Sequence, residues 1–226
     1  MSHTVGVVGH EDRADMMHGL ANLLRPEVMS LDDGTLGCEG NHRKVWQRLV
    51  DDYPQSRWTV VLEDDAVPVD NFDTQLEAAL RAAPASIVSL YLGRERPIDC
   101  QPRIQRLVDK GVDAHWIMAN RLLHAVGVAI RTALVPAMLA WVTDLTAGYP
   151  MDEAISGWAA AHRYPVAYTW PSLVDHADVP TVIAKHHDGA QRTAGRCAWH
   201  TGARSEWCST ATRLRLPERY SPRLIG

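Results

Sequence analysis

The chain has 226 residues, 46% of them hydrophobic and 22% charged, an ordinary globular composition that is sufficient for one large domain. Its formal net charge of −4 excludes a general electrostatic attraction to nucleic acid or to an anionic membrane. The charge is uneven, because residues 185–226 carry eight basic and three acidic side chains (+5), which leaves −9 on the first 184 residues.

The sequence predicts a cytoplasmic protein. Its start, "MSHTVGVVGHEDR", has no basic region leading into a long apolar stretch, so we expect no signal peptide. The longest apolar run, 132–142, is too short to span a bilayer and contains Pro136. The four cysteines are widely spaced and indicate free thiols rather than a disulfide framework. They are Cys38, Cys100, Cys197 and Cys208.

Short β-rich runs alternate with helical patterns along most of the chain. In chain order, we expect a strand at 4–10, a helix at 12–25, a strand at 27–33, a helix at 41–53, a strand at 57–65, a helix at 72–83, strands at 86–93 and 124–131, helices at 132–143 and 151–162, and a strand at 166–171. This alternation predicts an α/β fold with a mixed, mostly parallel sheet flanked by helices.

Two segments depart from this rhythm. Residues 94–123 contain Pro97, Pro102 and scattered charge, which predicts a loop-rich insertion over one end of the sheet. No strong periodicity remains after about residue 180. We therefore expect a domain at 1–184 and a basic C-terminal extension at 185–226, for which a solvated tail and an anionic partner are the alternative explanations.

Three consecutive acids, Glu63, Asp64 and Asp65, directly follow the apolar run "WTVVL". In open α/β sheets, ligands bind beyond the carboxyl ends of the strands, where these acids should lie. Alternation along an extended chain sends Glu63 and Asp65 to one side and Asp64 to the other. A divalent cation such as Mg²⁺ or Mn²⁺ would remove their repulsion and suits a phosphorylated substrate, whereas the alternative is a solvated acidic turn.

Four further features occur in a set order: "LGCEGNHRKVW" (36–46), "VVLEDDAVP" (60–68), "VSLYLGR" (88–94), and a last set of "HAVGVAIRTALVPAML", "YPMDEAI" and "YTWPSLVDH" between 124 and 176. Together they resemble glycosyltransferase family 25, the GT-A-type enzymes related to the lipooligosaccharide and collagen galactosyltransferases. The resemblance covers roughly residues 1–180. The first block keeps Gly37, Cys38, His42 and Trp46, with Asn41 where the family usually has Ser.

The resemblance implies a GT-A-like (Rossmann-like) fold and a metal-dependent, inverting transfer of a sugar from a nucleotide sugar, UDP-linked in our interpretation, to an acceptor hydroxyl. It implies that Asp65 holds Mn²⁺ or Mg²⁺ on the donor diphosphate, with Glu63 and Asp64 in support. His176 is a candidate to complete the metal sphere, or else a structural residue near a strand end. The cation would offset charge on the leaving diphosphate.

Residues for the donor nucleotide are expected in two places. The end of the first strand lies where this fold places the base and ribose, and the second helix begins with basic residues that could reach the diphosphate. The simpler alternative for each is an ordinary surface or core residue. These candidates are Gly9, His10, Arg13, His42, Arg43 and Lys44.

The general-base candidates are Asp152 and Glu153 in "YPMDEAI". Transfer to a hydroxyl needs a carboxylate to accept the acceptor proton, and the fold supplies an acid on this segment, so we select Asp152. Capping of a helix N-terminus is the alternative explanation for both acids.

The sequence leaves the acceptor open between a glycan, a protein and a hydroxymethylated base of DNA, the last as in a phage-encoded modifier of its own genome. The basic tail would then hold phosphates, and Trp199, Trp207 and Tyr220 would stack on an exposed base. Two other functions remain alternatives: an inactive nucleotide-sugar-binding protein and a metal-dependent nucleotidyltransferase. The tail also has zinc-ligand residue types at poor spacing: His186, His187, Cys197, His200 and Cys208.

Overall fold

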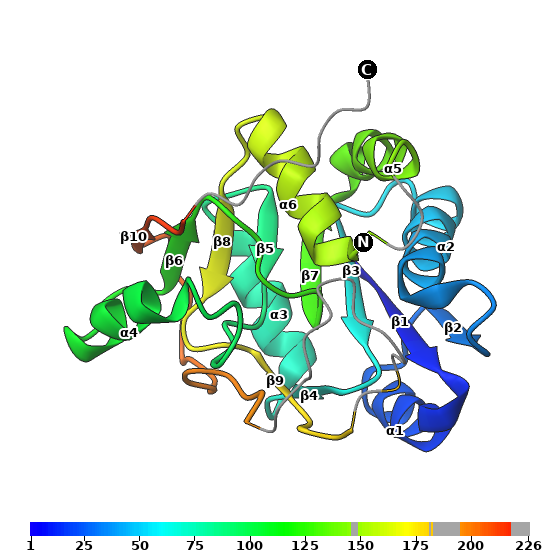
Figure 1. The fold of residues 1–226 in the computed structure, drawn as a ribbon, viewed down its shortest axis with the longest axis horizontal. Helices are drawn as coiled ribbons and strands as arrows, with labels where there is room; N and C mark the ends of the chain where they lie inside the picture. Colours follow the sequence, from blue (N-terminus) through cyan, green and yellow to red (C-terminus); the bar gives the residue numbers. More distant parts are fainter. Residues whose placement is uncertain (146–148, 181, 183–194, 218–226) are drawn as a thin grey trace.

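The computed structural model describes residues 1–145, 149–180, 182 and 195–217. Its centre is an eight-stranded sheet with the strand order β10-β6-β8-β5-β7-β3-β1-β2 (Figure 1). The strands of this sheet are β1 (Thr4–His10), β2 (Val28–Asp32), β3 (Trp58–Glu63), β5 (Ile87–Ser89), β6 (Trp116–Ala119), β7 (Gly127–Arg131), β8 (Val166–Thr169) and β10 (Ala211–Leu214). A separate antiparallel pair is formed by β4 (Ala66–Pro68) and β9 (Val174–His176).

The large sheet is mixed, as the sequence predicts. Strands β2, β1 and β3 run parallel to one another, and β5 runs parallel to β8 and β10 to β6. Strand β7 is antiparallel to both β3 and β5, and β6 is antiparallel to β8. Parallel pairings are therefore the more numerous, and the expected α/β fold class is confirmed.

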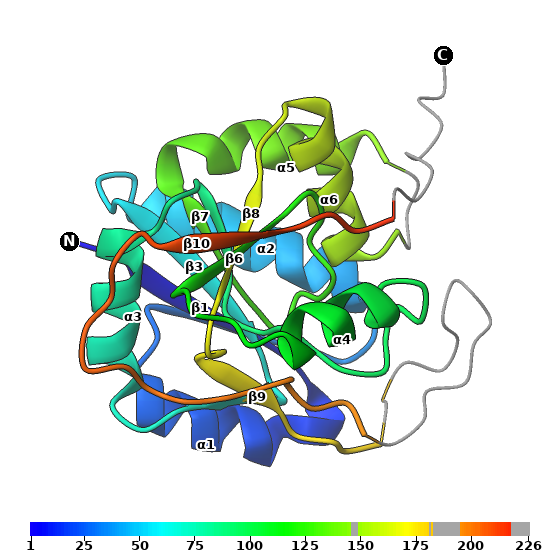
Figure 2. The same ribbon diagram turned by 90° about the vertical axis from the view of Figure 1, so that its left-hand side faces the viewer.

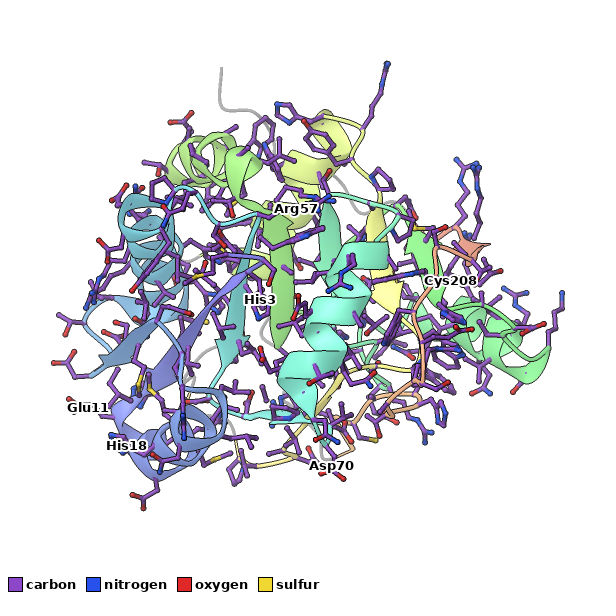
Figure 3. All side chains as sticks on the ribbon, turned by 180° about the vertical axis from the view of Figure 1, so that it is seen from behind. His3, Glu11, His18, Arg57, Asp70 and Cys208 are labelled. Atoms are coloured by element: carbon purple, nitrogen blue, oxygen red, sulfur yellow. The ribbon has the colours of Figure 1, made fainter. Side chains whose placement is uncertain are left out.

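Helices cover both faces of the sheet. Helices α2 (Gly37–Asp52), α5 (Val135–Thr143) and α6 (Met151–Ala161) pack together on one face (Figure 1). Helices α1 (Ala14–Leu24) and α3 (Phe72–Ala82) lie on the other face, which is turned toward the viewer in Figure 3. Successive side chains of β3 point to opposite faces of the sheet and so pack in two different cores. Val60 and Leu62 lie in the core beneath α1 and α3, and Val61 lies in the core beneath α2.

Helix α2 packs directly on strand β1 at Gly6. A Cβ atom placed on Gly6 would lie 2.4 Å from Cγ1 of Val45 and 2.8 Å from Cδ1 of Leu49. Because Gly6 has no side chain, Val45 and Leu49 pack directly against the backbone of β1, and α2 lies close to the sheet.

The expectation for residues 94–123 is wrong. This segment contains helix α4 (Gln101–Asp109) and strand β6, which pairs with β8 and β10 inside the large sheet. The prediction treated the prolines as signs of a loop. Pro102 instead lies in the first turn of α4, where its missing N–H breaks no helical hydrogen bond.

The described part of the C-terminal segment, 195–217, is not a separate appendage. Strand β10 pairs in parallel with β6 at the edge of the sheet, and Figure 2 shows the two side by side. Leu214 and Leu216 are buried in the same core as α2, and the guanidinium of Arg204 donates to the carbonyl oxygens of Trp170 and Ala114. The sheet domain therefore extends beyond residue 184.

Candidate active site

The acids that follow β3 are buried rather than solvated. Glu63 is the last residue of β3, and Asp64 and Asp65 form the turn that leads into β4. Asp64 and Asp65 expose only 6% and 5% of their surface, and Glu63 is partly buried. Burial of three adjacent carboxyl groups is unfavourable unless cations or hydrogen-bond donors compensate, which excludes the simple acidic turn.

Arg13 provides one such compensation. Its Nη1 atom lies 2.6 Å from Oδ2 of Asp65 and 3.1 Å from Oδ1 of Asp64, and its Nη2 atom donates to the carbonyl oxygen of Pro180. Burial lowers the pKa of Arg13, but the two carboxylates outweigh burial and the pKa is raised. Asp64 and Asp65 thus meet at one guanidinium, because the chain leaves the extended conformation after Glu63 and the expected alternation ends there.

His42 approaches Glu63 from helix α2. The Nε2 atom of His42 lies 3.2 Å from Oε1 of Glu63, and His42 is 1% exposed. Burial acts to raise the pKa of Glu63, but the hydrogen bond from His42 and the positive potential of His42, His176 and His124 lower it overall. Glu63 is therefore held as a carboxylate.

Asp65 is in the opposite situation. Burial and the neighbouring Glu63 raise the pKa of Asp65, and His176 and Arg13 offset only part of that rise. Strand β9 brings His176 to this position by pairing with β4, so that Nε2 of His176 lies 3.4 Å from Oδ2 of Asp65. Among the described residues, the buried atoms Oδ1 of Asp65 and Nδ1 of His176 have no hydrogen-bond partner.

Asp152 lies in the first turn of α6, near enough to the cluster for the charges of Glu63 and His42 to act on its pKa. Its Oδ1 atom accepts a hydrogen bond from the backbone N–H of Glu153. Burial, followed by the charges of Glu153 and Glu63, raises the pKa of Asp152 to about 7. The positive end of a helix dipole favours an ionised acid, typically by about 0.3–1 kcal/mol, so burial decides the outcome here.

The predicted donor residues divide between this cluster and the surface. The backbone N–H of His10 donates to Asp64 Oδ2 at 2.9 Å, while its ring accepts from the backbone N–H of Asp12, and the backbone of Gly9 lies close to the Asp64 side chain. Arg43 and Lys44 are exposed and, unlike His42, are not on the buried face of α2.

Sequence reasoning assigned no role to three residues near the acids. Burial of the thiol, followed by the charges of the acids Glu63, Asp152, Glu39 and Asp65, raises the pKa of Cys38 well above the ordinary value, although the residue as a whole is exposed. The ring of Tyr91 lies 5.2 Å from that of His124 and 6.2 Å from that of His176, measured between centroids. The four-residue spacing of Cys38 and His42 was the available signal for Cys38; none pointed to Tyr91.

The suggested zinc ligands in the C-terminal segment are not brought together where they are described. In the described part of the chain, the side chains placed closely enough to hold a metal ion are Cys38, His42 and Glu63, and this group does not include Cys197, His200 or Cys208. Sγ of Cys208 lies 3.1 Å from the hydroxyl of Thr210. His186 and His187 lie outside the described residues.

Residues 17–103 match the family model of glycosyltransferase family 25 (LPS biosynthesis protein). This range includes Cys38, His42 and the three acids, whereas Asp152 and His176 lie beyond it. The chain resembles this family, as its motifs indicate, and the match supports glycosyl transfer as the class of activity. No curated protein matches the chain.

Two solved structures are similar to this chain at low sequence identity. A197 from STIV has a TM-score of 0.45 and 8% identity, over 81% of this chain and 99% of that chain. A glycosyltransferase involved in the glycosylation of the major capsid of PBCV-1 has a TM-score of 0.33 and 7% identity, over 65% of this chain and 68% of that chain.

Proposed function

We propose that this protein transfers a sugar from a nucleotide sugar, UDP-linked and held through Mn²⁺ or Mg²⁺, to the hydroxyl of an acceptor. The observation that carries the proposal is the buried cluster in which Asp65, with one unpartnered carboxylate oxygen, lies beside Glu63 and His176. Asp152, an acid with a pKa near 7, lies near the same cluster in the first turn of α6.

The residue types of this cluster suit a divalent cation. Within the described residues, Glu63, Asp65 and His176 are not a group whose ligand atoms already lie within 4.8 Å of one another, so in the proposed function their side chains move together around the ion. Asp65 has a raised pKa and a buried oxygen without a partner, which is the state of a carboxyl group that lacks enough positive charge. Glu63 is already ionised, and His176 contributes an imidazole from β9. These three side chains would hold the ion, which when bound would neutralise charge on the leaving diphosphate.

Arg13 links the acids to the segment where the donor is expected. It contacts Asp64 and Asp65 and follows directly after β1, whose carboxyl end lies beside that of β3 because the two strands are parallel. In the proposed function Arg13 fixes both carboxylates and adds positive charge near the diphosphate. Gly9 and His10 line the same strand end, with Asp64 between them and Arg13.

Asp152 acts as the general base in this proposal. A carboxyl group with a pKa near 7 is ionised in about half of the molecules at neutral pH and is basic enough to accept the proton of an attacking hydroxyl. Attack from the face opposite the leaving diphosphate would invert the anomeric centre. Glu153 contributes negative charge that keeps the pKa of Asp152 high.

A glycan or protein hydroxyl is the proposed acceptor. For DNA, the sequence suggested basic and aromatic side chains of the C-terminal segment, but several of these serve the fold. Arg196 pairs with Asp178, Arg204 donates to two backbone carbonyls, and the indole N–H of Trp207 donates to Gln75. Lys185, Arg192, Arg219, Tyr220 and Arg223 lie outside the described residues.

The proposal is tested with a panel of nucleotide sugars and Mn²⁺, with and without candidate acceptors. Nucleoside diphosphate is the expected product. Release of pyrophosphate would instead identify a nucleotidyltransferase, and binding without turnover would identify an inactive nucleotide-sugar-binding protein. Transfer of labelled sugar to hydroxymethylated DNA, together with binding that weakens between roughly 50 and 200 mM salt, would assign the acceptor to DNA.

A further inference from the structure

A second set of metal-binding side chains adjoins the carboxylate cluster. Cys38, His42 and Glu63 each place one ligand atom so that the three atoms lie within 4.8 Å of one another. We propose that these three side chains bind a thiophilic divalent cation, with Zn²⁺ as the reference ion, and leave a fourth coordination position to solvent.

The backbone fixes the three ligands from two elements. Cys38 and His42 are four residues apart at the start of α2, so their side chains project from the same face of the helix. Glu63 ends β3, and the close contact of α2 with β1 holds the helix beside this strand end. The site therefore needs no rearrangement of the backbone.

The distances suit tetrahedral coordination. Two ligands that each lie about 2.1 Å from a tetrahedral ion are about 3.4 Å apart. Nε2 of His42 and Oε1 of Glu63 are 3.2 Å apart, so these two atoms already have nearly that separation. The thiol of Cys38 completes the set after a side-chain rotation, and its proton passes to solvent as the metal–sulfur bond forms. Coordination through Nε2 of His42 replaces the hydrogen bond of that atom to Glu63, so the neutral imidazole then carries its proton on Nδ1.

The chemistry of this set differs from that of the cluster around Asp65. Sulfur, nitrogen and oxygen together favour a borderline-soft ion such as Zn²⁺, whereas Mg²⁺ and Mn²⁺ prefer oxygen ligands. Cys38 is exposed as a residue, so an ion from solvent can reach the thiol, while His42 is buried and rigidly held. The two sites share Glu63.

Sharing of Glu63 has a functional consequence that rests on the proposed function. Zn²⁺ on Cys38, His42 and Glu63 would take this carboxylate away from the ion at Asp65 and place positive charge next to Asp152. We therefore expect Zn²⁺ to inhibit transfer even at saturating Mn²⁺. Binding of Zn²⁺ itself does not depend on the transferase activity.

The first experiment measures alkylation of the wild-type protein by iodoacetamide, with the modified cysteines identified by peptide mass spectrometry. Stoichiometric Zn²⁺ should slow the modification of Cys38 by about tenfold or more, because a metal-bound thiolate is a poor nucleophile. Cys197 and Cys208 serve as internal controls and should react at unchanged rates, and Mg²⁺ should protect none of the three.

The second experiment measures Zn²⁺ affinity by competition with a chromophoric chelator. Cys38→Ser should weaken the affinity by about tenfold or more, since one of three ligands loses its sulfur, and Cys197→Ser should leave it unchanged. Circular dichroism checks that both variants are folded. An absence of Zn²⁺ binding, equal protection of all three cysteines, or unchanged affinity in Cys38→Ser would each overturn the site. If Zn²⁺ binds to the site but does not inhibit sugar transfer, the result would count against the proposed function and not against the Zn²⁺ site.

Discussion

At the scale of single residues, burial acts to raise the pKa of all three acids, and their neighbours decide which of them stays ionised. The pKa of Glu63 is nevertheless lowered, mainly by the hydrogen bond and charge of His42. The pKa of Asp65 is raised by burial and by the charge of Glu63, and the pKa of Asp152 by burial and by the charge of Glu153. The three carboxyl groups thus have different environments within one cluster. Separation of pKa values among neighbouring acids is typical of sites that use one group for binding and another for proton transfer.

Asp65→Asn should abolish turnover and weaken nucleotide-sugar binding in the presence of Mn²⁺. The amide keeps the shape of the side chain but cannot offer a charged oxygen to the ion, and Arg13 keeps its contacts with Asp64 and Pro180. The free energy of unfolding should change by no more than about 1 kcal/mol. Calorimetric titration with donor and urea unfolding measure the two quantities.

Asp51→Asn, an exposed acid in the last turn of α2, is the matched control and should behave as wild type. Full activity of Asp65→Asn, or full activity of the wild-type protein in EDTA, would contradict the metal assignment.

Asp152→Asn should lower kcat by orders of magnitude while donor affinity stays nearly constant, because proton removal is felt in the transition state. In the wild type, kcat/KM should rise with pH up to about 7 and then level off, because the base form appears as Asp152 loses its proton. This rise of kcat/KM between acidic pH and about pH 7 should disappear in Asp152→Asn and remain in Glu153→Gln. If the rise of kcat/KM with pH is lost in Glu153→Gln instead, the base is Glu153.

The same shift predicts how stability depends on pH. Folding raises the pKa of Asp152 from the ordinary 3.8 to about 7, so between these values the native state binds the proton that the unfolded state has released. This acid therefore makes the free energy of unfolding fall as pH rises from about 4 to about 7. Urea unfolding over that range should show a shallower fall in Asp152→Asn, and an identical slope in both proteins would contradict the raised pKa.

At the scale of elements, the site depends on how closely α2 lies against β1. Gly6→Ala should lower the free energy of unfolding by about 1–3 kcal/mol, because the new methyl group would overlap Val45 and Leu49. Gly19→Ala, in α1, is the control: its Cβ would meet nothing within 4 Å, and alanine in a helix is favoured over glycine by about 1 kcal/mol. Urea unfolding should show opposite signs for the two variants, and equal signs would refute the close packing.

At the scale of the whole molecule, the acids lie at the carboxyl end of β3, and the C-terminal segment closes the far edge of the same sheet. Figure 3 labels Arg57, which lies just before β3, and Asp70, which lies shortly after β4. The two labels thus bracket the segment that contains β3, the three acids and β4. Strand β10 covers the edge of β6 and buries Leu214. No helix in the described ranges is both long and apolar enough for a membrane span.

A chain that ends at residue 210 should be markedly less stable than one that ends at residue 217. The shorter chain loses β10 and the buried Leu214 and Leu216, and β6, which then pairs only with β8, becomes the edge strand of the sheet. Thermal unfolding and size-exclusion chromatography compare the two chains, and we expect a lower Tm and more aggregation for the shorter one. Equal stability would show that β10 contributes nothing to the domain.

The sequence by itself determined the strands β1, β2, β3, β5, β7 and β8, the helices α1, α2, α3, α5 and α6, and the position of the acids. It did not predict α4 or the strands β4, β6, β9 and β10. The predicted features are local: apolar runs form strands, and a strand that ends in "EDD" must place those acids at its carboxyl edge wherever the sheet goes. The choice of Asp152 came from the family resemblance together with the need for a proton acceptor.

Only the tertiary structure decided how these residues meet. Arg13 reaches Asp65 across 52 positions of the chain, and β9 brings His176 to Asp65 through pairing with β4. The pKa of Asp152 depends on burial by surrounding elements, which no local pattern encodes. Strand β10, "ATRL", has too few apolar residues to be recognised as a strand. It forms by pairing with β6, a neighbour that the local sequence does not reveal.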